Sequence, residues 1–392
     1  MGGVSMETYK LSDLCEILDA KRKPLSALQR AKKQGIYPYY GAQGIIDHLD
    51  EYLLDGEYLL VAEDGANLET RNQPIANIAK GKIWVNNHAH VLGSNGICPL
   101  NLLGFILNSM NISPYVTGCA QPKLNQENLR NIEIELPSHI DRIASILSSL
   151  DRKIELNNKI NADLEEMAQA IFKNWFVDFE PFKDGKFVNS ELGMIPEGWK
   201  VGRLDEIADV VGGSTPSKAK PEYYTQKGIA WLTPKDLSNH PAVYSSRGEI
   251  DITEEGYNST STKLMPKGTV LFTSRAPIGY ISIAQDDICT NQGFKSLVPK
   301  KAGTCFLYCF LKYVTPEIEN KSTGSTFKEA SGALMKSLQV IIPEQKVFED
   351  FESIALPLFT RIESLEKESS RLSLLRDTLL PRLMSGEIEV PE

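Results

Sequence analysis

Two polar loops carry residue types that suit contact with nucleic acid, TGCAQPKLN at 117–125 and STGSTFKEAS at 322–331. Gly and Ser allow close backbone approach, Lys neutralises a phosphate, and Gln, Thr and Ser can form hydrogen bonds with base edges. SRAPIGY at 274–280 adds an arginine able to bind guanine in bidentate fashion, and ICTNQGFKSL at 288–297 adds two amides and a lysine. Any single loop could equally be an ordinary polar turn. Because equivalent loops occur twice in the chain, a binding role is favoured.

Motifs that would carry catalysis are missing from the sequence. It contains no Gly-rich phosphate loop, no GxGxxG pattern after a strand and no GxSxG nucleophile turn. It contains no Pro-Pro pair either, so the Asn/Asp-Pro-Pro-aromatic motif of amino methyltransferases is absent. We therefore predict a chain without catalytic residues.

The histidines and cysteines do not predict a metal site. Strand alternation would place His88 and His90 on one face, and His48 is a third candidate ligand. No Cys, Asp or Glu stands at a spacing typical of zinc ligands, so a structural or DNA-facing role for the NNHAH segment is favoured. The six cysteines form no CxxC pair, which predicts free thiols in a reducing cytoplasm.

Length and composition indicate a globular protein of several domains. The 392 residues, 42% of them hydrophobic, allow two or three domains with sizeable cores. No apolar run reaches the roughly 18 residues that span a bilayer, and the first residues lack the pattern of a secretory signal. We therefore expect a cytoplasmic protein without membrane contact.

The net charge of −9 is unevenly distributed along the chain. Residues 1–138 carry 12 Lys and Arg against 15 Asp and Glu, residues 199–343 carry 17 against 14, and the remainder carries 13 against 22. One globular half is therefore mildly basic, and the acidic surplus lies elsewhere. A local basic face could still dock on phosphates.

The stretch 139–176 predicts one long helix, since it contains neither Pro nor Gly. Its apolar residues follow a heptad pattern with two gaps, which are filled by Asn157 and Asn161. An apolar seam broken by buried Asn is typical of a coiled-coil strand whose register is specified at some cost in stability. The alternative is a single amphipathic core helix. Ser138 is the expected N-cap.

The chain repeats itself with a period of about half its length. LSDLCEI at 11–17 returns as LDEIADV at 204–210, and LRNIEIELP at 129–137 returns as MKSLQVIIP at 335–343. GCAQPKLN returns in the same way as GSTFKEAS, and a helical pattern follows each copy. Within the first copy, 36–46 predicts a strand that runs into a turn, 57–65 and 82–93 each predict one strand, and residues near 100–110 predict a helix.

The repeat predicts an α+β protein with two mixed α/β domains and two long antiparallel helices, related by a pseudo-two-fold axis. The two domains would then sit at opposite ends of a helical rod. Pro357 predicts a kink or a late start of the second helix. The expected boundaries are 1–138 for the first domain, 139–178 for the central helix, 179–198 for a connector, 199–343 for the second domain, and 344–392 for the distal helix and tail.

At this point the chain resembles a known family. VGGSTPSKAKPEYYTQKGIAWLTPKDL, KIWVNNHAHVL, the two polar loops, SLDRKIELNNKINADLEEMAQAIFKNWFVDFEP and LLRDTLLPRLMSGEIEV are together similar to type I restriction–modification specificity subunits. The resemblance implies two target-recognition domains, each reading one half of a bipartite site in double-stranded DNA. It also implies that two methyltransferase subunits dock on the helices and that restriction and translocase subunits join them. S-adenosylmethionine, ATP and Mg would be used by those partners, with no cofactor in this chain.

The DNA-binding residues expected from the loops and the resemblance are Gln43, Asn87, His88, Gln121, Lys123, Ser214, Lys218, Lys235, Arg275, Asn291, Gln292, Thr326 and Lys328. The first domain departs from the family pattern, since it has the basic stretch 21–33 where a GGSTP loop is expected. Two alternatives are a self-contained DNA adenine methyltransferase with fused recognition domains and a coiled-coil scaffold that binds no DNA. The missing catalytic motifs argue against the first.

Overall fold

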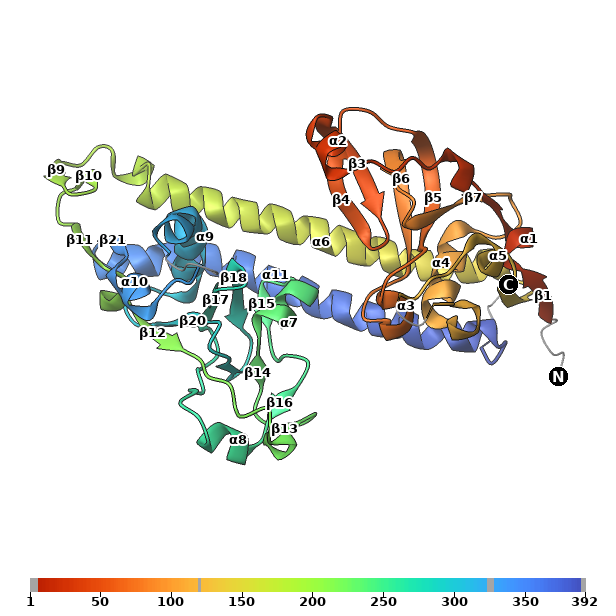
Figure 1. The fold of residues 1–392 in the computed structure, drawn as a ribbon. Coiled ribbons are helices and arrows are strands. Elements are labelled where there is room, and N and C mark those ends of the chain that lie inside the picture. Colours follow the sequence, from red (N-terminus) through yellow and green to blue (C-terminus); the bar gives the residue numbers. More distant parts are fainter. Residues whose placement is uncertain (1–5, 119–120, 323–327, 389–392) are drawn as a thin grey trace. The chain divides into compact units, whose positions relative to one another are not determined.

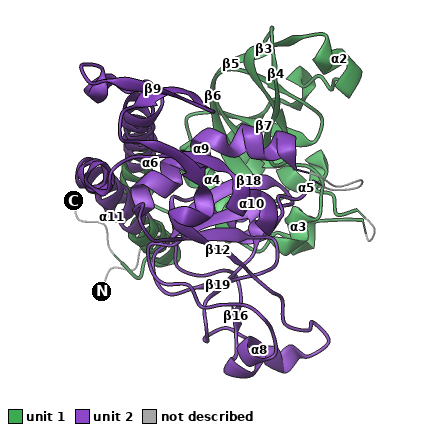
Figure 2. Ribbon diagram, turned by 90° about the vertical axis from the view of Figure 1, so that its left-hand side faces the viewer, with its two compact units in different colours: residues 1–155, 370–392 green, residues 156–369 purple. Residues whose placement is uncertain are grey.

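The computed structural model describes residues 6–118, 121–322 and 328–388. The chain forms two compact units, unit 1 with residues 1–155 and 370–392, and unit 2 with residues 156–369 (Figure 2). Both unit boundaries fall inside long helices, α6 (Ile140–Phe176) and α11 (Gln345–Met384). Among the described residues, none of the helices combines the length and apolar character needed to cross a lipid bilayer.

A six-stranded sheet forms the centre of unit 1 (Figure 1). Its strands lie in the order β2 (Cys15–Ile17), β7 (Ala89–Ser94), β5 (Leu54–Ala62), β6 (Ala76–Val85), β3 (Gln34–Gly41) and β4 (Gly44–Leu49). Neighbouring strands are antiparallel, except that β3 and β6 run parallel. Leu103 and Leu107 of α4 (Leu100–Ser109) share a core with Leu59 and Leu92 of the sheet.

Shorter elements complete unit 1. They are β1 (Met6–Lys10), α1 (Leu11–Leu14), η1 (Asp19–Lys21), α2 (Ala27–Ala31), α3 (Asn67–Thr70), η2 (Ser113–Tyr115), α5 (Gln126–Arg130) and β8 (Glu133–Pro137). β1 and β8 form an antiparallel pair directly before α6. Asn125 caps α5, because its side chain accepts a hydrogen bond from the Asn128 N–H.

A five-stranded sheet forms the centre of unit 2. Its strands lie in the order β12 (Ala208–Gly212), β20 (Lys295–Pro299), β17 (Val270–Ser274), β18 (Ile278–Ala284) and β15 (Tyr244–Ser245). Three other strand pairs complete the unit's main frame: β11 (Lys200–Arg203) with β21 (Gln339–Ile342), β13 (Tyr224–Thr225) with β16 (Asp251–Ile252), and β14 (Trp231–Leu232) with β19 (Cys289–Thr290). Only the last of these pairs is parallel.

The helices of unit 2 include α9 (Thr304–Lys321), which has the same place in the chain order as α4 in unit 1. The other short elements are η3 (Glu180–Phe182), β9 (Phe187–Ser190), β10 (Gly193–Pro196), η4 (Leu204–Glu206), η5 (Pro221–Tyr223), α7 (Pro234–Asn239), α8 (Glu254–Asn258) and α10 (Gly332–Ser337). Ser331 caps α10 as Asn125 caps α5.

The two long helices pack against each other inside each unit. In unit 1, Ile143 of α6 shares a core with Leu383 of α11. In unit 2, the rings of Phe172 and Phe351 lie 6.2 Å apart, and Asn157 donates a hydrogen bond to Glu368 at 3.0 Å. Later residues of α6 therefore meet earlier residues of α11, so the pairing is antiparallel, as the repeat predicted.

The internal repeat is confirmed at the level of topology. In each unit an antiparallel strand pair, β1 with β8 or β11 with β21, stands directly before a long helix. A short helical turn, α1 or η4, follows the first strand of each pair, and a short capped helix, α5 or α10, precedes the second. The mixed α/β character of both halves is likewise confirmed.

Several local expectations are wrong. Residues 82–93 do not form one strand, because β6 ends at Val85 and the Asn86 side chain accepts a hydrogen bond from the His88 N–H at 2.8 Å, which closes a turn before β7. His88 and His90 therefore do not share a strand face. α6 begins at Ile140, so Ser138 is not its N-cap. α11 has no late start, since it is continuous through Pro357, which is exposed to solvent.

Candidate nucleic-acid interface

In unit 1 the parallel pairing of β3 and β6 brings two turns together. Tyr39 pairs with Trp84 and Tyr40 with Val85, so both strands end at the same edge. The backbone N–H of Asn86 then donates to the Tyr40 carbonyl at 3.1 Å. The exposed residues predicted to bind DNA at this edge are Gln43, Asn87 and His88. Their common position follows from the parallel register, which the sequence alone does not reveal.

Unit 2 builds the same pair of turns from different residues. β14 and β19 are parallel, and the Asn291 N–H donates to the Leu232 carbonyl at 3.0 Å. The Asn291 side chain accepts from the Gly293 N–H at 2.8 Å, which repeats the Asn86 turn of unit 1. The side-chain oxygen of Asn291 is thus already engaged inside the protein. Gln292, which follows it, is exposed.

An open cavity of about 830 Å³ lies at this edge of unit 2. Its walls bring together five of the residues predicted to bind DNA, namely Lys218, Lys235, Arg275, Asn291 and Gln292. Three of these carry positive charge, against the carboxylates of Asp236 and Glu249 on the same wall. The cavity is therefore mildly cationic and amide-rich, which suits a polyanion with hydrogen-bonding edges.

The Gly213–Ser214 segment is fixed by backbone contacts beside this cavity. The Ser214 N–H donates to the Thr290 carbonyl at 3.0 Å, and the Ser214 carbonyl accepts from the indole N–H of Trp231 at 3.1 Å. A Cβ on Gly213 would lie 2.2 Å from the carbonyl oxygens of Thr290 and Asn291, so only Gly fits there. The neighbouring Thr215 hydroxyl donates to the side-chain carbonyl of Gln292. Ser214 itself is only half-buried.

The two polar loops are anchored in the same way. In unit 1 the Leu124 N–H donates to the Glu63 carbonyl at 2.8 Å, and in unit 2 the Ala330 N–H donates to the Ser274 carbonyl at 2.9 Å. Gln121 is exposed in the first loop. In the second, Lys328 donates to the Glu319 carbonyl at 3.4 Å, and Thr326 lies outside the described residues.

An ion cluster that the sequence did not predict supports the first loop. The unit-1 cluster consists of Asp19, Arg22, Glu63, His90 and Lys123. His90 Nδ1 lies 2.6 Å from an Asp19 oxygen, and Lys123 Nζ lies 3.1 Å from a Glu63 oxygen. Arg22 contacts both carboxylates, at 3.2 Å and 2.5 Å. These residues come from four separate segments, so no spacing in the sequence could have revealed the cluster.

Electrostatics keep the carboxylates of the unit-1 cluster ionised. Burial alone would raise the pKa of Asp19, but hydrogen bonds from His90 and Val91 and the charge of Arg22 hold it below its usual value. Burial likewise opposes ionisation of Glu63, and Arg22, Lys123 and His90 together lower its pKa. Asp19, Glu63 and His90 are close enough to hold a metal ion. Internal cations already occupy the oxygens that a metal would need.

The corresponding cluster in unit 2 is smaller and more exposed. The unit-2 cluster consists of Arg275, Lys295 and Glu329, with Glu329 oxygens 3.4 Å from Arg275 and 3.5 Å from Lys295. The Arg275 and Glu329 side chains are 36% and 38% exposed, and Lys295 is 16% exposed. Here the loop carries the anion, whereas in unit 1 the loop residue Lys123 is the cation.

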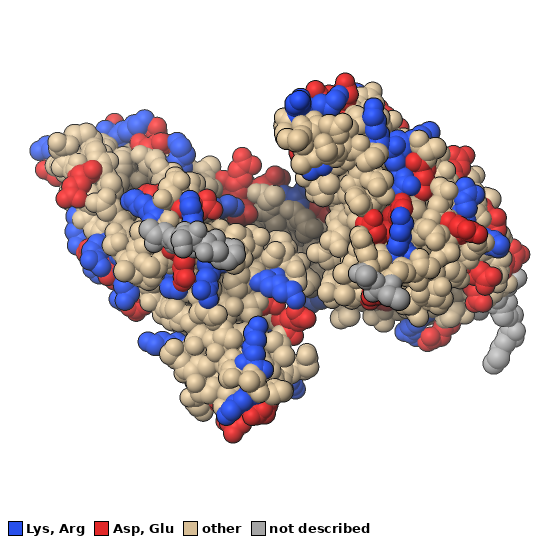
Figure 3. All heavy atoms as spheres, viewed as in Figure 1, with Lys and Arg blue, Asp and Glu red and all other residues tan. Residues whose placement is uncertain are grey.

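Three of the six cations in the basic stretch 21–33 pair with carboxylates inside unit 1. Arg30 pairs with Asp47 at 2.9 Å and Lys33 with Glu51 at 2.6 Å, while Arg22 belongs to the unit-1 cluster. Figure 3 shows that Lys and Arg alternate with Asp and Glu over the visible face of both units. On this face, phosphate contact would therefore depend on individual cations.

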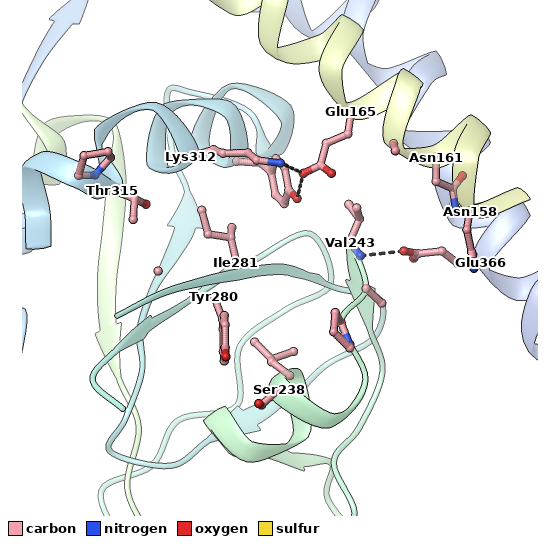
Figure 4. A pocket seen from close by; sticks show the side chains of 17 residues that line it. Asn158, Asn161, Glu165, Ser238, Val243, Tyr280, Ile281, Lys312, Thr315 and Glu366 are labelled. Atoms are coloured by element: carbon pink, nitrogen blue, oxygen red, sulfur yellow. Dashed lines mark hydrogen bonds and ion pairs between the residues drawn. The ribbon is translucent and has the colours of Figure 1, made fainter. Parts of the chain in front are cut away.

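A second cavity of unit 2, of about 610 Å³, is lined by none of the described residues predicted to bind DNA (Figure 4). Two carboxylates of the long helices reach across it to the sheet domain. Glu165 of α6 accepts from the Tyr308 hydroxyl at 2.5 Å and pairs with Lys312. Glu366 of α11 accepts from the backbone N–H groups of Val243 and Tyr244 at 2.7 and 3.0 Å. These contacts fasten the sheet of unit 2 to its own part of the helix pair.

Comparison with known proteins places this geometry in a family. A family model described as the type I restriction modification DNA specificity domain matches residues 3–166 and 196–354. The chain is 34% identical over 415 residues to the specificity subunit of the type I restriction enzyme MjaVIII of Methanocaldococcus jannaschii, which covers 98% of this chain and 93% of that protein. It is 24% identical over 449 residues to the HindI specificity subunit of Haemophilus influenzae, covering 95% and 91%.

Two further matches differ in extent. With the MjaIX specificity subunit of M. jannaschii, 38% identity extends over 190 residues, which are 48% of this chain and 44% of that protein. The crystal structure of a type I restriction-modification S subunit from M. genitalium superposes with a TM-score of 0.56 at 18% identity, covering 100% of this chain and 98% of that one. That likeness supports the fold. Since the family model matches both halves and most of the sequence, the chain belongs to the family of type I restriction–modification DNA specificity proteins.

Proposed function

We propose that each unit of this specificity subunit reads one half of a bipartite site in double-stranded DNA. The observation that carries the proposal is the repeated frame of two turns and one anchored loop, built on β3, β6 and β5 in unit 1 and on β14, β19 and β17 in unit 2. Equivalent frames with different exposed side chains suit the recognition of two unlike half-sites.

The residues proposed to contact DNA fall into two groups by chemistry. In unit 2, Lys218 would meet a phosphate, because it is exposed on the cationic cavity. Lys235 is exposed there as well, and its 3.4 Å pair with Glu249 is open to solvent, so it could exchange that partner for a phosphate. Gln292 would read a base edge, since it is exposed at the tip of its turn. In unit 1, Gln43 and Asn87 hold the corresponding positions, and an exposed amide can bind adenine in bidentate fashion.

The chain's own role is recognition, and the chemistry belongs to its partners. We propose that two methyltransferase subunits dock on α6 and α11, and that restriction and translocase subunits join them in the cytoplasm. The partners would use S-adenosylmethionine, ATP and Mg. The acidic surplus of the helices, connector and tail suits a protein-docking surface better than a DNA-binding one.

The test is a map of methylated adenines in cells that carry this chain with its methyltransferase partners. The parent should yield one bipartite motif. Exchanging residues 200–343 for the matching domain of a relative should change one half of the motif and leave the other intact. The reciprocal exchange of residues 1–138 is the matched control and should change the opposite half. A motif altered in both halves, or in neither, would contradict two independent readers.

The spacing between the half-sites offers a separate test. Because both α6 and α11 pass from one unit into the other, we propose that their length sets the number of bases between the half-sites. Adding four residues after Asn158 and four after Lys367 lengthens the helix pair by about 6 Å, which is close to two base pairs. The methylation motif should keep both halves and gain one or two spacer positions. An unchanged spacer in an active complex would show that a feature other than helix length sets the number of bases between the half-sites.

A further inference from the structure

We propose that the ion clusters of the two units are latches that fix the second half of each polar loop, residues 121–125 and 328–331, with His90 and Lys295 as positioning residues rather than DNA contacts. This proposal rests on the proposed function only for the role of the loops in reading DNA. The ion clusters could hold the loops in place whatever the loops bind. It follows from three observations, namely the burial of His90, the number of bonds that converge on each loop, and the exchange of charge between the units.

His90 is buried completely and joins two segments that are distant in the sequence. Its Nδ1 lies 2.6 Å from Asp19 of η1, and its Nε2 lies 2.7 Å from the Leu124 carbonyl in the first loop. Both partners are hydrogen-bond acceptors, and each lies against a different nitrogen of the ring. The ring is therefore a strut that connects η1 to the first loop through both of its nitrogens. Removing it leaves the carbonyl and the carboxylate without this donor.

Glu63 holds the same loop from the other side. Its backbone carbonyl accepts from the Leu124 N–H, and its carboxylate binds Lys123 Nζ at 3.1 Å. Lys123 also pairs with Thr117 through two backbone hydrogen bonds of 2.7 and 2.8 Å. Successive residues of the loop are thus fixed through main chain and side chain alike. Gln121, which is exposed, is presented from this fixed segment.

The exchange of charge between the units shows what these positions require. Two matching hydrogen bonds align the frames of the two units. The Glu63 N–H donates to the His88 carbonyl at 2.9 Å in unit 1, and the Ser274 N–H donates to the Gly293 carbonyl at 2.7 Å in unit 2. His90 then corresponds to Lys295. By the loop anchors, Lys123 corresponds to Glu329, so the loop residue is a cation in one unit and an anion in the other.

A residue selected to meet DNA phosphate would not be an anion in the second copy. The property common to both units is an ion pair between the loop and the strand ends. Buried ion pairs contribute little net stability compared with apolar packing, and in some proteins they instead select one conformation. A charged cluster at the base of a recognition loop therefore fits a positioning role better than a stabilising one.

The first experiment measures the loop directly in the full-length chain. Hydrogen exchange of peptides covering residues 121–125 should be at least tenfold faster in His90→Leu than in the parent, with peptides of α9 unchanged. His90→Gln, which keeps a donor for the Leu124 carbonyl, is the conservative variant and should recover most of the protection. Parent-like exchange in His90→Leu would overturn the latch. If His90→Leu does not fold, Lys295→Met carries the test on the second loop, where exchange of residues 328–331 should be faster than in the parent. Parent-like exchange there would overturn the latch.

The second experiment measures recognition in the complex with its methyltransferase partners, on a library of randomised half-sites. His90→Leu should reduce discrimination at one half-site tenfold or more and change the other less than twofold. Lys295→Met should do the reverse, to a smaller extent. If the parent itself shows no bipartite preference, the proposed function fails, while the exchange measurement still decides the latch.

Charge reversal separates a latch from a direct contact. Arg275→Glu and Glu329→Lys should each weaken discrimination at the unit-2 half-site, and the double variant should recover to within threefold of the parent. An arginine that touches DNA would not be rescued by a lysine at position 329. A double variant as poor as Arg275→Glu alone would therefore overturn the latch in unit 2.

Discussion

The two units anchor their polar loops on the same backbone frame but at different depths. In unit 1 the strut, His90, is completely buried, and Asp19 beside it is 4% exposed. In unit 2 the equivalent Lys295 is 16% exposed, and its partner Glu329 is 38% exposed. Burial determines how strongly the loss of such a contact affects stability, since a desolvated ion pair is costly to break while a solvated one contributes little. One topology can thus carry a rigid loop in one copy and a more compliant loop in the other.

The comparison predicts its largest effect for loss of the buried strut. His90→Leu should lower the free energy of unfolding of unit 1 by about 2–3 kcal/mol, because it leaves the buried Leu124 carbonyl without its ring donor. Asp19 loses the same ring but keeps its contacts with Arg22 and Gln126. Lys295→Met should change unit 2 by less than about 1 kcal/mol. Trp84 is the only tryptophan of unit 1 and the other three lie in unit 2, so ¹⁹F NMR of fluorotryptophan-labelled protein follows each unit separately during denaturation. Equal losses of unfolding free energy in the two variants would show that burial does not set how much each cluster contributes to stability.

Buried carboxyl groups of the two units should also respond to pH with opposite sign. Burial raises the pKa of the Glu366 carboxyl in unit 2 to about 6, although the N–H groups of Val243 and Tyr244 oppose this. The folded state then binds the proton more tightly than the unfolded chain, whose pKa is about 4.5. Its contribution is fully present below pH about 4.5 and is lost as the pH rises through about 6.

Relative to Glu366→Gln, the parent should therefore lose about 2 kcal/mol of unit-2 stability between pH 4 and pH 7. In unit 1 the pKa values of Asp19 and Glu63 are lowered, so the stability they contribute is present above their usual pKa and is lost on acidification. Unfolding series at several pH values, read from the same fluorotryptophan signals, test both signs. A unit-2 difference that grows with pH would contradict the raised pKa of Glu366.

The helix pair differs between the units in a similar way. In unit 1, Ile143 and Leu147 of α6 join an apolar core with Leu380 and Leu383 of α11. In unit 2, the side-chain oxygen of Asn161 is buried, and no described residue offers it a hydrogen bond. An unsatisfied buried acceptor costs about 1–3 kcal/mol.

Asn161→Leu should therefore raise the stability of unit 2 by about 1 kcal/mol, measured by the same denaturation series. Asn157→Leu is the matched control, and it should gain less, because the Asn157 amide donates to both Glu368 and Ser369. A destabilising Asn161→Leu would indicate that this position has a partner or a steric limit that the apolar side chain violates.

The parts of this architecture that could be predicted from sequence are those with a local periodic signal. The heptad pattern of 139–176, the repeated segments and the apolar run near 100–110 each matched an element of the structure. The break in 82–93 escaped prediction because no Gly or Pro marks the turn, which the Asn86 side chain closes instead. Pro357 indicated an interruption that does not occur. Phe351, Ala355 and Phe359 on either side of it are buried, and their packing keeps α11 continuous.

The candidate site was predictable by residue type but not by arrangement. Polar loops with a lysine or an amide stand out in the sequence, and five of the predicted residues do line one cavity. The internal partners of Lys123 and Arg275 do not stand out, because Glu63 and Glu329 are 60 and 54 residues away from them in the chain. A cation that looks free in a sequence can be held by a contact that only the tertiary fold creates.

The smallest predicted effect concerns salt dependence and divides the lysines by their contacts. Lys218 is exposed on the unit-2 cavity, so Lys218→Ala in the assembled complex should lower the slope of log K against log salt concentration by about 0.9, the value for one phosphate. Lys123 is half-exposed and is held by Glu63, and meeting a phosphate would require it to give up that pair. Lys123→Ala should therefore lower the slope by clearly less, while it loosens base discrimination through the loop. Fluorescence anisotropy of a labelled duplex between about 50 and 200 mM salt measures both slopes. Equal slopes for the two variants would show that Lys123 binds a phosphate, as its place in a polar loop first indicated.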